Sequence, residues 1–274
     1  MMVKTDPTVR GQLVLLGTGT SHGVPVIGCD CSTCMSDHPR NRRTRCAALF
    51  GLPEGNLLID TPPELRIQLL REGVGLVHAV ALTHGHADHL FGLDDLRIFP
   101  RYLHHEVPIY CESVVEQAVR RAFAYAFDPA FEHFPPGHVP KLAFRRIGGE
   151  PFDALGARVQ PIRLLHGADP ILGYRVGNIA YCTDAKRVPP ESLALLEGLD
   201  ALVINGLRHK PHPTHMTLDE AIELIGRIRP QQAYITHTSH RLEYEATNRQ
   251  LPAGMELAYD GLRIPFSFAA GGLT

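Results

Sequence analysis

Four side chains that commonly bind metal ions lie within six residues of this chain, in the run His84-Gly85-His86-Ala87-Asp88-His89. The run directly follows the apolar segment 79–82, which is typical of a buried strand. Because side chains alternate along an extended backbone, His84 and His86 point the same way and can hold one cation. If a helix begins just after them, Asp88 and His89 lie at its start and reach a second cation. The run therefore predicts a fold in which the end of a strand delivers ligands to two neighbouring metal ions.

The chemistry of these ligands narrows the choice of metal. Imidazole nitrogens together with a carboxylate suit zinc, manganese or iron. A pair of such ions is a common device for placing a hydroxide in line with a phosphoryl or acyl centre. A histidine-rich solvated loop is the alternative interpretation, but it does not explain why later strand-like segments also end in ligand-type residues. Those later residues are His166, Asp184 and His237.

The six residues match the H-x-H-x-D-H signature of the metallo-β-lactamase superfamily. The continuation 90–97 (LFGLDDLR) is similar to the branch of that family that contains the phosphoribosyl cyclic phosphodiesterase of phosphonate breakdown. The resemblance extends from Gly17 to about Ile264. It implies an αββα sandwich with a binuclear site on one edge between the sheets. The order of strand-like and helix-like segments agrees, since it suits two mixed sheets packed face to face with helices outside.

The resemblance also implies a role for each ligand. It assigns one ion to His84, His86 and His166, the other to Asp88, His89 and His237, and a bridging position to Asp184. The working ions would be zinc or manganese, with iron as a third option. A hydroxide between them, oriented by Asp88 or Asp184, would attack the substrate. His215 matches a catalytic histidine of the resembled enzyme and would donate a proton to the departing oxygen or clamp the phosphate.

A second predicted metal site is built on cysteine. Cys29, Cys31 and Cys34 need one further ligand to complete a tetrahedral zinc site, and Cys₃His sites are common. We expect His240 to be that ligand, and the C-x-C-x-x-C cluster and H-x-x-H pair of the resembled branch support this choice. A Cys31/Cys34 redox pair or unligated thiols are the alternatives. A redox C-x-x-C normally opens a helix in a thioredoxin-like unit, a pattern that this region lacks.

The substrate-binding residues are predicted less directly. Three histidines at a spacing of three precede a helix, and His209 and His212 could contact substrate, form a regulatory metal site or lie on the surface. The helix amides together with Arg208 and His215 would suit an anion. The basic run 40–45 resembles an arginine-rich stretch of the phosphodiesterase, so we expect phosphate contact from Arg45, with a solvated loop as the alternative.

Short sequence patterns predict where two helices begin and suggest a role for one acidic residue. Thr61 and Glu64 have the spacing of a capping box, with prolines at the first helical positions, and Thr217 and Glu220 repeat the pattern before a second helix. Asp60 ends a strand-like segment. It is either an acceptor for a metal-bound imidazole or an ordinary turn residue.

Composition bounds the protein's class and surroundings. A chain of 274 residues can bury a large core, and we expect one domain over 1–274 with an inserted zinc loop at about 28–46. The net charge of −2 offers no basic field for gripping long nucleic acids. No membrane span or secretion signal is expected, which predicts a cytoplasmic protein whose cysteines are thiols or metal ligands. A homodimer is compatible with the sequence.

Four functions fit these features. The favoured one is hydrolysis of a small phosphodiester, a cyclic one in particular. A lactonase or thioesterase would use the same ligands on an acyl carbon. A tRNA 3′-processing endonuclease would share the fold, but no long basic insertion is present to hold tRNA. A cofactor-biosynthesis binding protein, like the quinone-biosynthesis member of the superfamily, also has a cysteine cluster, although the complete ligand set argues against a purely binding role.

Overall fold

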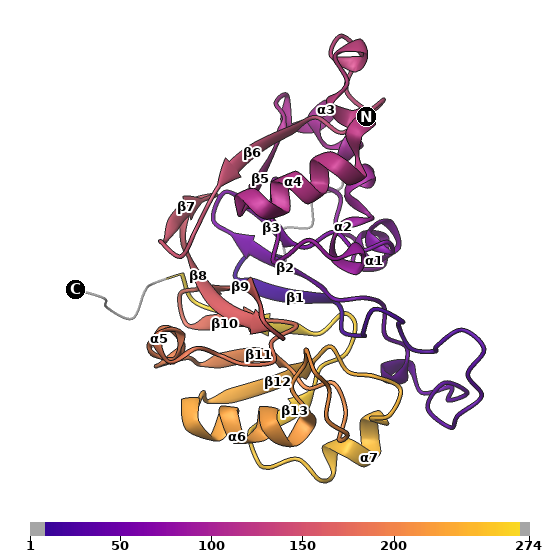
Figure 1. Cartoon of the computed structure of the whole chain (residues 1–274), viewed down its shortest axis with the longest axis vertical. Helices are drawn as coiled ribbons and strands as arrows, with labels where there is room; N and C mark the ends of the chain where they lie inside the picture. The colour runs from indigo at the N-terminus through magenta and orange to yellow at the C-terminus, as the bar shows by residue number, and fades with distance from the viewer. Residues whose placement is uncertain (1–8, 269–274) are drawn as a thin grey trace.

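Two seven-stranded mixed sheets form the centre of the molecule, in a computed structural model that describes residues 9–268. The first sheet has the strand order β14-β1-β2-β3-β4-β5-β6, and the second has the order β13-β12-β11-β10-β9-β8-β7. The sheets stack face to face, the first in the upper half of Figure 1 and the second in the lower half. This is the αββα sandwich expected from the sequence.

Each sheet joins antiparallel strands to a run of parallel ones. The first sheet contains β1 (Gln12–Gly17), β2 (Ala47–Leu52), β3 (Gly55–Ile59), β4 (Ala79–Ala81), β5 (Val107–Cys111), β6 (Leu142–Arg146) and β14 (Arg263–Pro265). The second contains β7 (Phe152–Ala154), β8 (Ala157–His166), β9 (Asp169–Val176), β10 (Ile179–Cys182), β11 (Ala201–Asn205), β12 (Gln232–Thr236) and β13 (Met255–Leu257). The pairs from β3 to β6 and from β10 to β13 are parallel.

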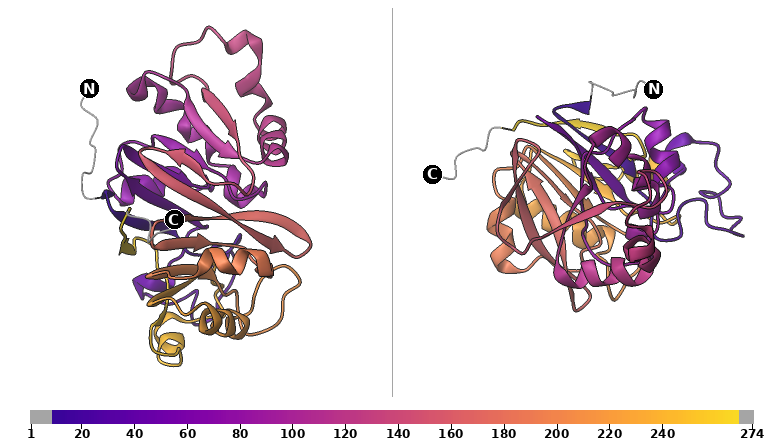
Figure 2. Two further views of the ribbon diagram at one scale, coloured as in Figure 1. Left: turned by 90° about the vertical axis from the view of Figure 1, so that its left-hand side faces the viewer. Right: turned by 90° about the horizontal axis from the view of Figure 1, so that it is seen from above.

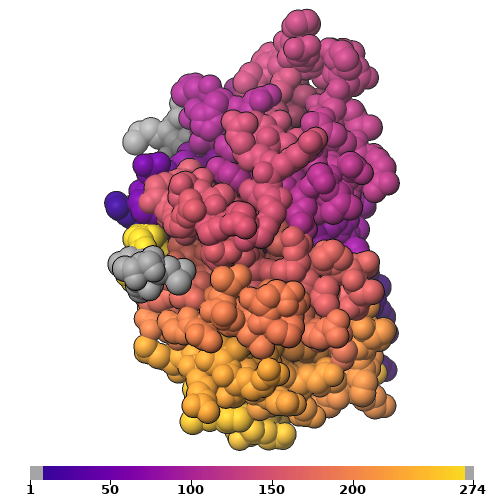
Figure 3. Space-filling view, turned by 60° about the vertical axis from the view of Figure 1, so that its left-hand side comes forward, coloured from indigo at the N-terminus to yellow at the C-terminus, as the bar shows by residue number. Residues whose placement is uncertain are grey.

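Alternating side chains hold the layers together. Leu13 and Leu15 of β1 pack between the sheets, whereas Val14 and Leu16 face the outer helices. The helices are α1 (Leu65–Arg71), α2 (Ala87–Leu90), α3 (Pro100–Leu103), α4 (Ser113–Ala122), α5 (Pro190–Leu193), α6 (Leu218–Ile228) and α7 (Tyr244–Asn248). Helices α1 and α4 cover the first sheet, and α5, α6 and α7 cover the second. The space-filling view shows the C-terminal half of the chain forming one end of the molecule (Figure 3).

The parallel strands decide where the functional side chains meet. Strands β3 and β4 run in the same direction, so Asp60 and the histidine run emerge at one edge of the first sheet. In the second sheet, β8 is antiparallel to β9, and β9 is antiparallel to β10. Strands β8, β10 and β12 therefore end at a common edge, where His166, Asp184 and His237 follow or close them.

The long connection between β1 and β2 contains the cysteine cluster and protrudes from one side of the sandwich (Figure 1). The connection is longer than the inserted loop predicted at about 28–46, which lies inside it, and it reaches across to the segment that follows β12. Within residues 9–268, no helix has the length and apolar character needed to span a bilayer.

The two predicted capping boxes have different outcomes. Thr217 caps α6 as expected, because its hydroxyl accepts from the Glu220 amide while the Glu220 carboxylate accepts from the Thr217 amide. The prediction of a capping box at Thr61 and Glu64 is wrong. Helix α1 follows Glu64 without a side-chain cap, and the Thr61 hydroxyl donates instead to the carbonyl of Leu90, next to the histidine run.

Candidate metal centre

All seven residues predicted to form the binuclear site converge at the shared edge of the two sheets. Loop residues after β4 and the start of α2 supply His84, His86, Asp88 and His89, while the second sheet supplies His166, Asp184 and His237. The rings of His84 and His86 lie 4.6 Å apart, and the His166 ring lies 5.0 Å from that of His86. The ligand atoms of these three histidines all lie within 4.8 Å of one another.

Asp184 stands between the two halves of the site. Its Oδ2 lies 3.5 Å from His89 Nε2, and its Oδ1 lies 3.1 Å from His237 Nδ1. It also belongs to a group with His166 and His215 whose ligand atoms lie within 4.8 Å of one another. Asp88 approaches from the other side, with its Oδ2 3.4 Å from His89 Nε2. The Asp184 carboxylate, which lies between the two halves of the site, can contribute one oxygen to each of two ions.

Within residues 9–268, three buried ring nitrogens of the centre make no hydrogen bond of good geometry. They are Nε2 of His89, Nδ1 of His237 and Nδ1 of His215. A buried polar nitrogen without a partner is unfavourable, and a metal ion is one way to satisfy several at once. Since two of these nitrogens face the Asp184 carboxylate, the residues present fit divalent metal ions.

Other contacts fix the orientation of the rings. Asp60 is fully buried, and its Oδ2 lies 2.7 Å from His89 Nδ1. The backbone amide and the hydroxyl of Thr83 both donate to the same carboxylate. His166 Nδ1 lies 2.8 Å from the carbonyl oxygen of Asp184. Holding one nitrogen of each ring in this way directs the other nitrogen to the centre, so Asp60 fits the acceptor role rather than that of a turn residue alone.

The backbone turns sharply at three of these residues. Asp60, Asp184 and His237 have φ angles of 63°, 61° and 52°, in the left-handed region. Each follows the end of a strand, so the unusual backbone lets the chain leave the sheet while the side chain stays at the edge. Such conformations are uncommon outside glycine and cluster at functional sites.

The Asp184 carboxylate creates a local negative field at His237. Burial opposes the charge of Asp184, but His237 and His89 beside it hold its pKa well below the usual value. Burial also opposes a charge on His237, yet Asp184 raises the pKa of His237 to about 10. A field that draws protons onto buried imidazoles will also attract divalent cations, which compete with those protons for the same nitrogens.

Removing the Asp60 carboxylate should weaken metal binding. We expect Asp60→Asn to lower the affinity for manganese at the His89 side by about tenfold or more, because the imidazole loses the anion that orients it. Titration calorimetry of the metal-free protein measures this affinity, with Asp153→Asn on the exposed surface as the matched control. An unchanged affinity would mean that Asp60 is a turn residue only.

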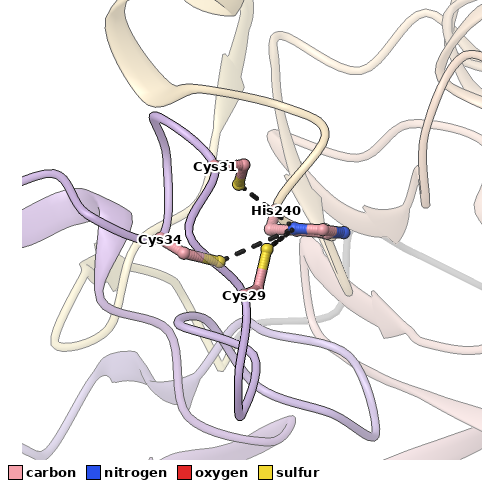
Figure 4. Close-up of side chains that lie close together, drawn as sticks. All are labelled: Cys29, Cys31, Cys34 and His240. Carbon is pink, nitrogen blue, oxygen red and sulfur yellow. Dashed lines mark hydrogen bonds between the residues drawn. The ribbon is translucent and has the colours of Figure 1, made fainter.

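A second cluster brings together the predicted cysteines and His240 (Figure 4). The sulfur atoms of Cys29, Cys31 and Cys34 lie 3.2, 3.3 and 3.6 Å from His240 Nδ1. Metal–ligand bonds of about 2.0–2.3 Å in a tetrahedral zinc site separate its ligands by about 3.5 Å. A hydrogen bond from the Cys34 amide is the main cause that lowers the pKa of Cys31 to about 6, which favours the thiolate that binds zinc.

All six cysteines of the chain are free thiols.

The loop between β11 and α6 places His215 at the centre and the other two histidines farther out. The His215 ring lies 4.6 Å from that of His166 and 4.7 Å from that of His237. The His212 ring lies 5.0 Å from the His215 ring and is tilted by 44° relative to it, whereas His209 is exposed. The guanidinium of Arg208 donates to carbonyls of its own loop. His212 is therefore better placed than His209 for contact with a substrate.

Arg45 is already engaged in an ion pair. Its Nη1 lies 2.5 Å from a carboxylate oxygen of Glu64, and its Nε donates to the Ser21 carbonyl. These contacts compete with a phosphate for the guanidinium. Contact of Arg45 with substrate stays a prediction.

Sequence reasoning missed two polar residues that support the centre. Asn205, buried at the end of β11, accepts from the Ala185 amide and donates to the Ala185 carbonyl, which fixes the turn that carries Asp184. Thr83 orients Asp60, as described above. Both are polar residues at strand ends, and that pattern alone could have marked them.

Comparison with known proteins adds the family context. The model of the beta-lactamase superfamily domain matches residues 55–238. A crystal structure described as a new diphosphatase from the PhnP family is 43% identical, with a TM-score of 0.87 over 93% of this chain and 96% of that one.

Two curated relatives carry other names. The octanoyltransferase of Porphyromonas gingivalis is 38% identical over 92% of this chain, but the chain spans only 51% of that relative. Coenzyme PQQ synthesis protein B of Methylorubrum populi is 28% identical over 71% of this chain and 72% of its own length.

Proposed function

We propose, since the chain belongs to the metallo-β-lactamase superfamily, that it is a metal-dependent hydrolase and, more narrowly, a phosphodiesterase acting on a small, in particular cyclic, phosphodiester. The observation that most supports this proposal is the position of Asp184, whose two carboxylate oxygens lie 3.5 Å from His89 Nε2 and 3.1 Å from His237 Nδ1. That arrangement suits two adjacent ions, the device that many enzymes use on phosphoryl groups.

The residues that would hold the ions are those predicted from the sequence. His84, His86 and His166 would hold one ion, Asp88, His89 and His237 the other, and Asp184 both. Bound divalent ions, manganese, zinc or iron, would activate a water molecule and neutralise the negative charge that develops on the phosphoryl oxygens. The carboxylates of Asp88 and Asp184 would accept hydrogen bonds from that water and so aim it at the phosphorus atom.

His215 would assist the departure of the leaving group. Burial and the nearby His237 hold its pKa at about 3, so the ring is neutral in the free protein at neutral pH. An anionic phosphoryl group beside the ring would raise that pKa. His215 would then hydrogen-bond the phosphate and donate a proton to the departing oxygen. His212, whose ring lies 5.0 Å from that of His215, would contact the rest of the substrate.

A second candidate is hydrolysis of a diphosphate. The 43% identical crystal structure is described as a diphosphatase. A phosphoric anhydride presents the same phosphoryl centre and the same developing charge as a diester. The two activities differ in the leaving group, a phosphate in one case and an alcohol in the other.

Parallel assays of the manganese-loaded protein distinguish these functions. The substrates are bis(p-nitrophenyl) phosphate, a ribose cyclic phosphate, a nucleoside diphosphate, an aliphatic lactone and a tRNA precursor. We expect the two diesters to be cleaved far faster than the lactone or the tRNA. Cleavage of the diphosphate alone would favour the second candidate. Preference for the lactone, or no hydrolysis by the metal-loaded protein, would overturn the proposal.

The cysteine cluster is proposed to bind one structural zinc ion through Cys29, Cys31, Cys34 and His240. We expect Cys31→Ser to lose that zinc and to melt at a lower temperature, because the ion ties the β1–β2 connection to the second sheet. Metal analysis and calorimetry measure both effects. Met35→Ser, at an exposed position of the same loop, is the control. A variant that keeps its zinc and its melting temperature would contradict a structural zinc site.

A further inference from the structure

One short segment carries a ligand of each metal cluster. His237 faces Asp184 at the binuclear centre, and His240, three residues later, faces the three cysteine sulfurs. The segment leaves β12 in the left-handed turn at His237, and the backbone amides of Thr238 and Ser239 donate to the carbonyls of Thr18 and Leu207. A shift of this segment would move both ligands together. Whatever fixes it therefore affects both sites.

A buried arginine fixes this segment. The Arg43 residue is 1% exposed, and its guanidinium makes five hydrogen bonds, which matches the number of its N–H donors. Three of these bonds reach the segment after His237. Nη1 donates to the Thr238 hydroxyl at 2.8 Å and to the Ser239 carbonyl at 3.1 Å, and Nη2 donates to the Leu242 carbonyl at 2.7 Å.

The remaining bonds anchor the guanidinium to its own loop. Nη2 also donates to the Asn41 side-chain oxygen at 3.2 Å, and Nε donates to the Arg40 carbonyl at 3.3 Å. The backbone of Arg43 pairs with Val24 in both directions at 2.8 Å. Two residues after Val24, the Val26 amide donates to the Cys34 sulfur. Arg43 therefore contacts the cysteine loop through its backbone and the histidine segment through its side chain.

The five acceptors around this cation are neutral oxygens. Burial lowers the pKa of Arg43 to about 10, although Asp260 and Glu243 favour its charge, so the group is still protonated at neutral pH. A buried cation is expensive unless it is well hydrogen-bonded. Only a flat group with several donors can satisfy all of these acceptors, which a lysine ammonium cannot do. The geometry is thus specific to arginine.

We propose that Arg43 is a positioning residue that sets His237 and His240 for their two metal sites together, so that occupancy of one site strengthens binding at the other. The inference rests on the proposed binding of metals at both sites, but it does not depend on the substrate. Reciprocal strengthening of this kind follows from a shared element that both ligands stabilise.

The test compares metal binding in Arg43→Met, Thr238→Val and the exposed-neighbour control Arg42→Met. We expect Arg43→Met to weaken manganese binding at the binuclear centre about tenfold and to release zinc from the cysteine cluster about tenfold faster, as is typical when a group that orients metal ligands is lost. Thr238→Val removes one acceptor without changing side-chain volume, so both changes should be smaller but in the same direction. The control should resemble wild type.

Coupling between the sites is measured separately. Cys31→Ser should weaken manganese binding in the wild-type background but have a smaller effect in the Arg43→Met background, because the link is already broken. If Arg43→Met fails to fold, the same comparison is made with Thr238→Val. A change confined to one site, or an equal effect of Cys31→Ser in both backgrounds, would overturn the proposal. Since manganese and zinc binding are read without substrate, a missing phosphodiesterase activity would not be confused with this result.

Discussion

Replacing Asp184 with alanine is expected to abolish hydrolysis while leaving zinc in the cysteine cluster. The carboxylate is buried between His89 and His237 and shares a group of ligand atoms with His166, so in the proposed assignment its loss would remove a ligand from both ions. Losing several kcal/mol of charge stabilisation in the transition state corresponds to at least about a thousandfold lower rate. Hydrolysis of bis(p-nitrophenyl) phosphate gives the rate, and metal analysis gives the content of each ion.

The control for this variant is Asp153→Ala, which removes a largely exposed carboxylate from the same sheet. Its activity and metal content should equal those of the wild type. Coupling through Arg43 is expected to weaken the zinc site only about tenfold, so Asp184→Ala should keep its zinc. Loss of metal from both clusters would contradict two separate sites. Near-normal turnover of Asp184→Ala would contradict the shared position of its carboxylate between two ions.

Replacing His215 with alanine is expected to lower kcat by about a hundredfold to ten-thousandfold, the range for loss of a general acid. The reason is its position beside both halves of the centre, with a buried Nδ1 that lacks a hydrogen-bond partner. We expect the metal content to be unchanged and KM to change much less than kcat. Steady-state kinetics with the ribose cyclic phosphate, whose leaving group is an alcohol, measure kcat and KM. Metal analysis measures the metal content.

His209→Ala is the matched control, since His209 is an exposed histidine on the same loop. Substrates with better leaving groups need less help from an acid, so they should lose less rate in the His215 variant. An equal loss for all leaving groups would instead indicate that His215 clamps the phosphate. If the His215 variant loses a metal ion, then His215 is a ligand, as its grouping with His166 and Asp184 would allow.

Much of the fold and of the centre could be predicted from local patterns. Strand-like segments ending in His166, Asp184 and His237 were informative because parallel strands bring their ends to one edge, whatever lies between them in the sequence. The spacing of His84 and His86 follows directly from the alternation of an extended backbone. The family resemblance then assigned the seven ligand candidates to two ion sites. The structure brings these seven side chains together at one edge of the sandwich.

Features that depend on distant contacts could not be predicted in this way. The Thr61 hydroxyl has a partner near the histidine run, which outweighs the local preference for a helix cap. The arginine run looked like a solvated or phosphate-binding loop, yet Arg43 is buried among carbonyls almost 200 residues away in sequence. The need for glycine at position 17 also depends on a distant contact, because a Cβ there would lie 2.0 Å from the Arg45 carbonyl oxygen.

The division of the ligands between the two sheets has a consequence for the order of assembly. A chain emerging from the ribosome presents the histidine run early, but His237 appears only after most of the chain has been made. Until β12 has joined its sheet, Asp88 and His89 lack the His237 side chain that would complete their ligand set. Any reaction that needs both ions would therefore begin only when the fold is finished.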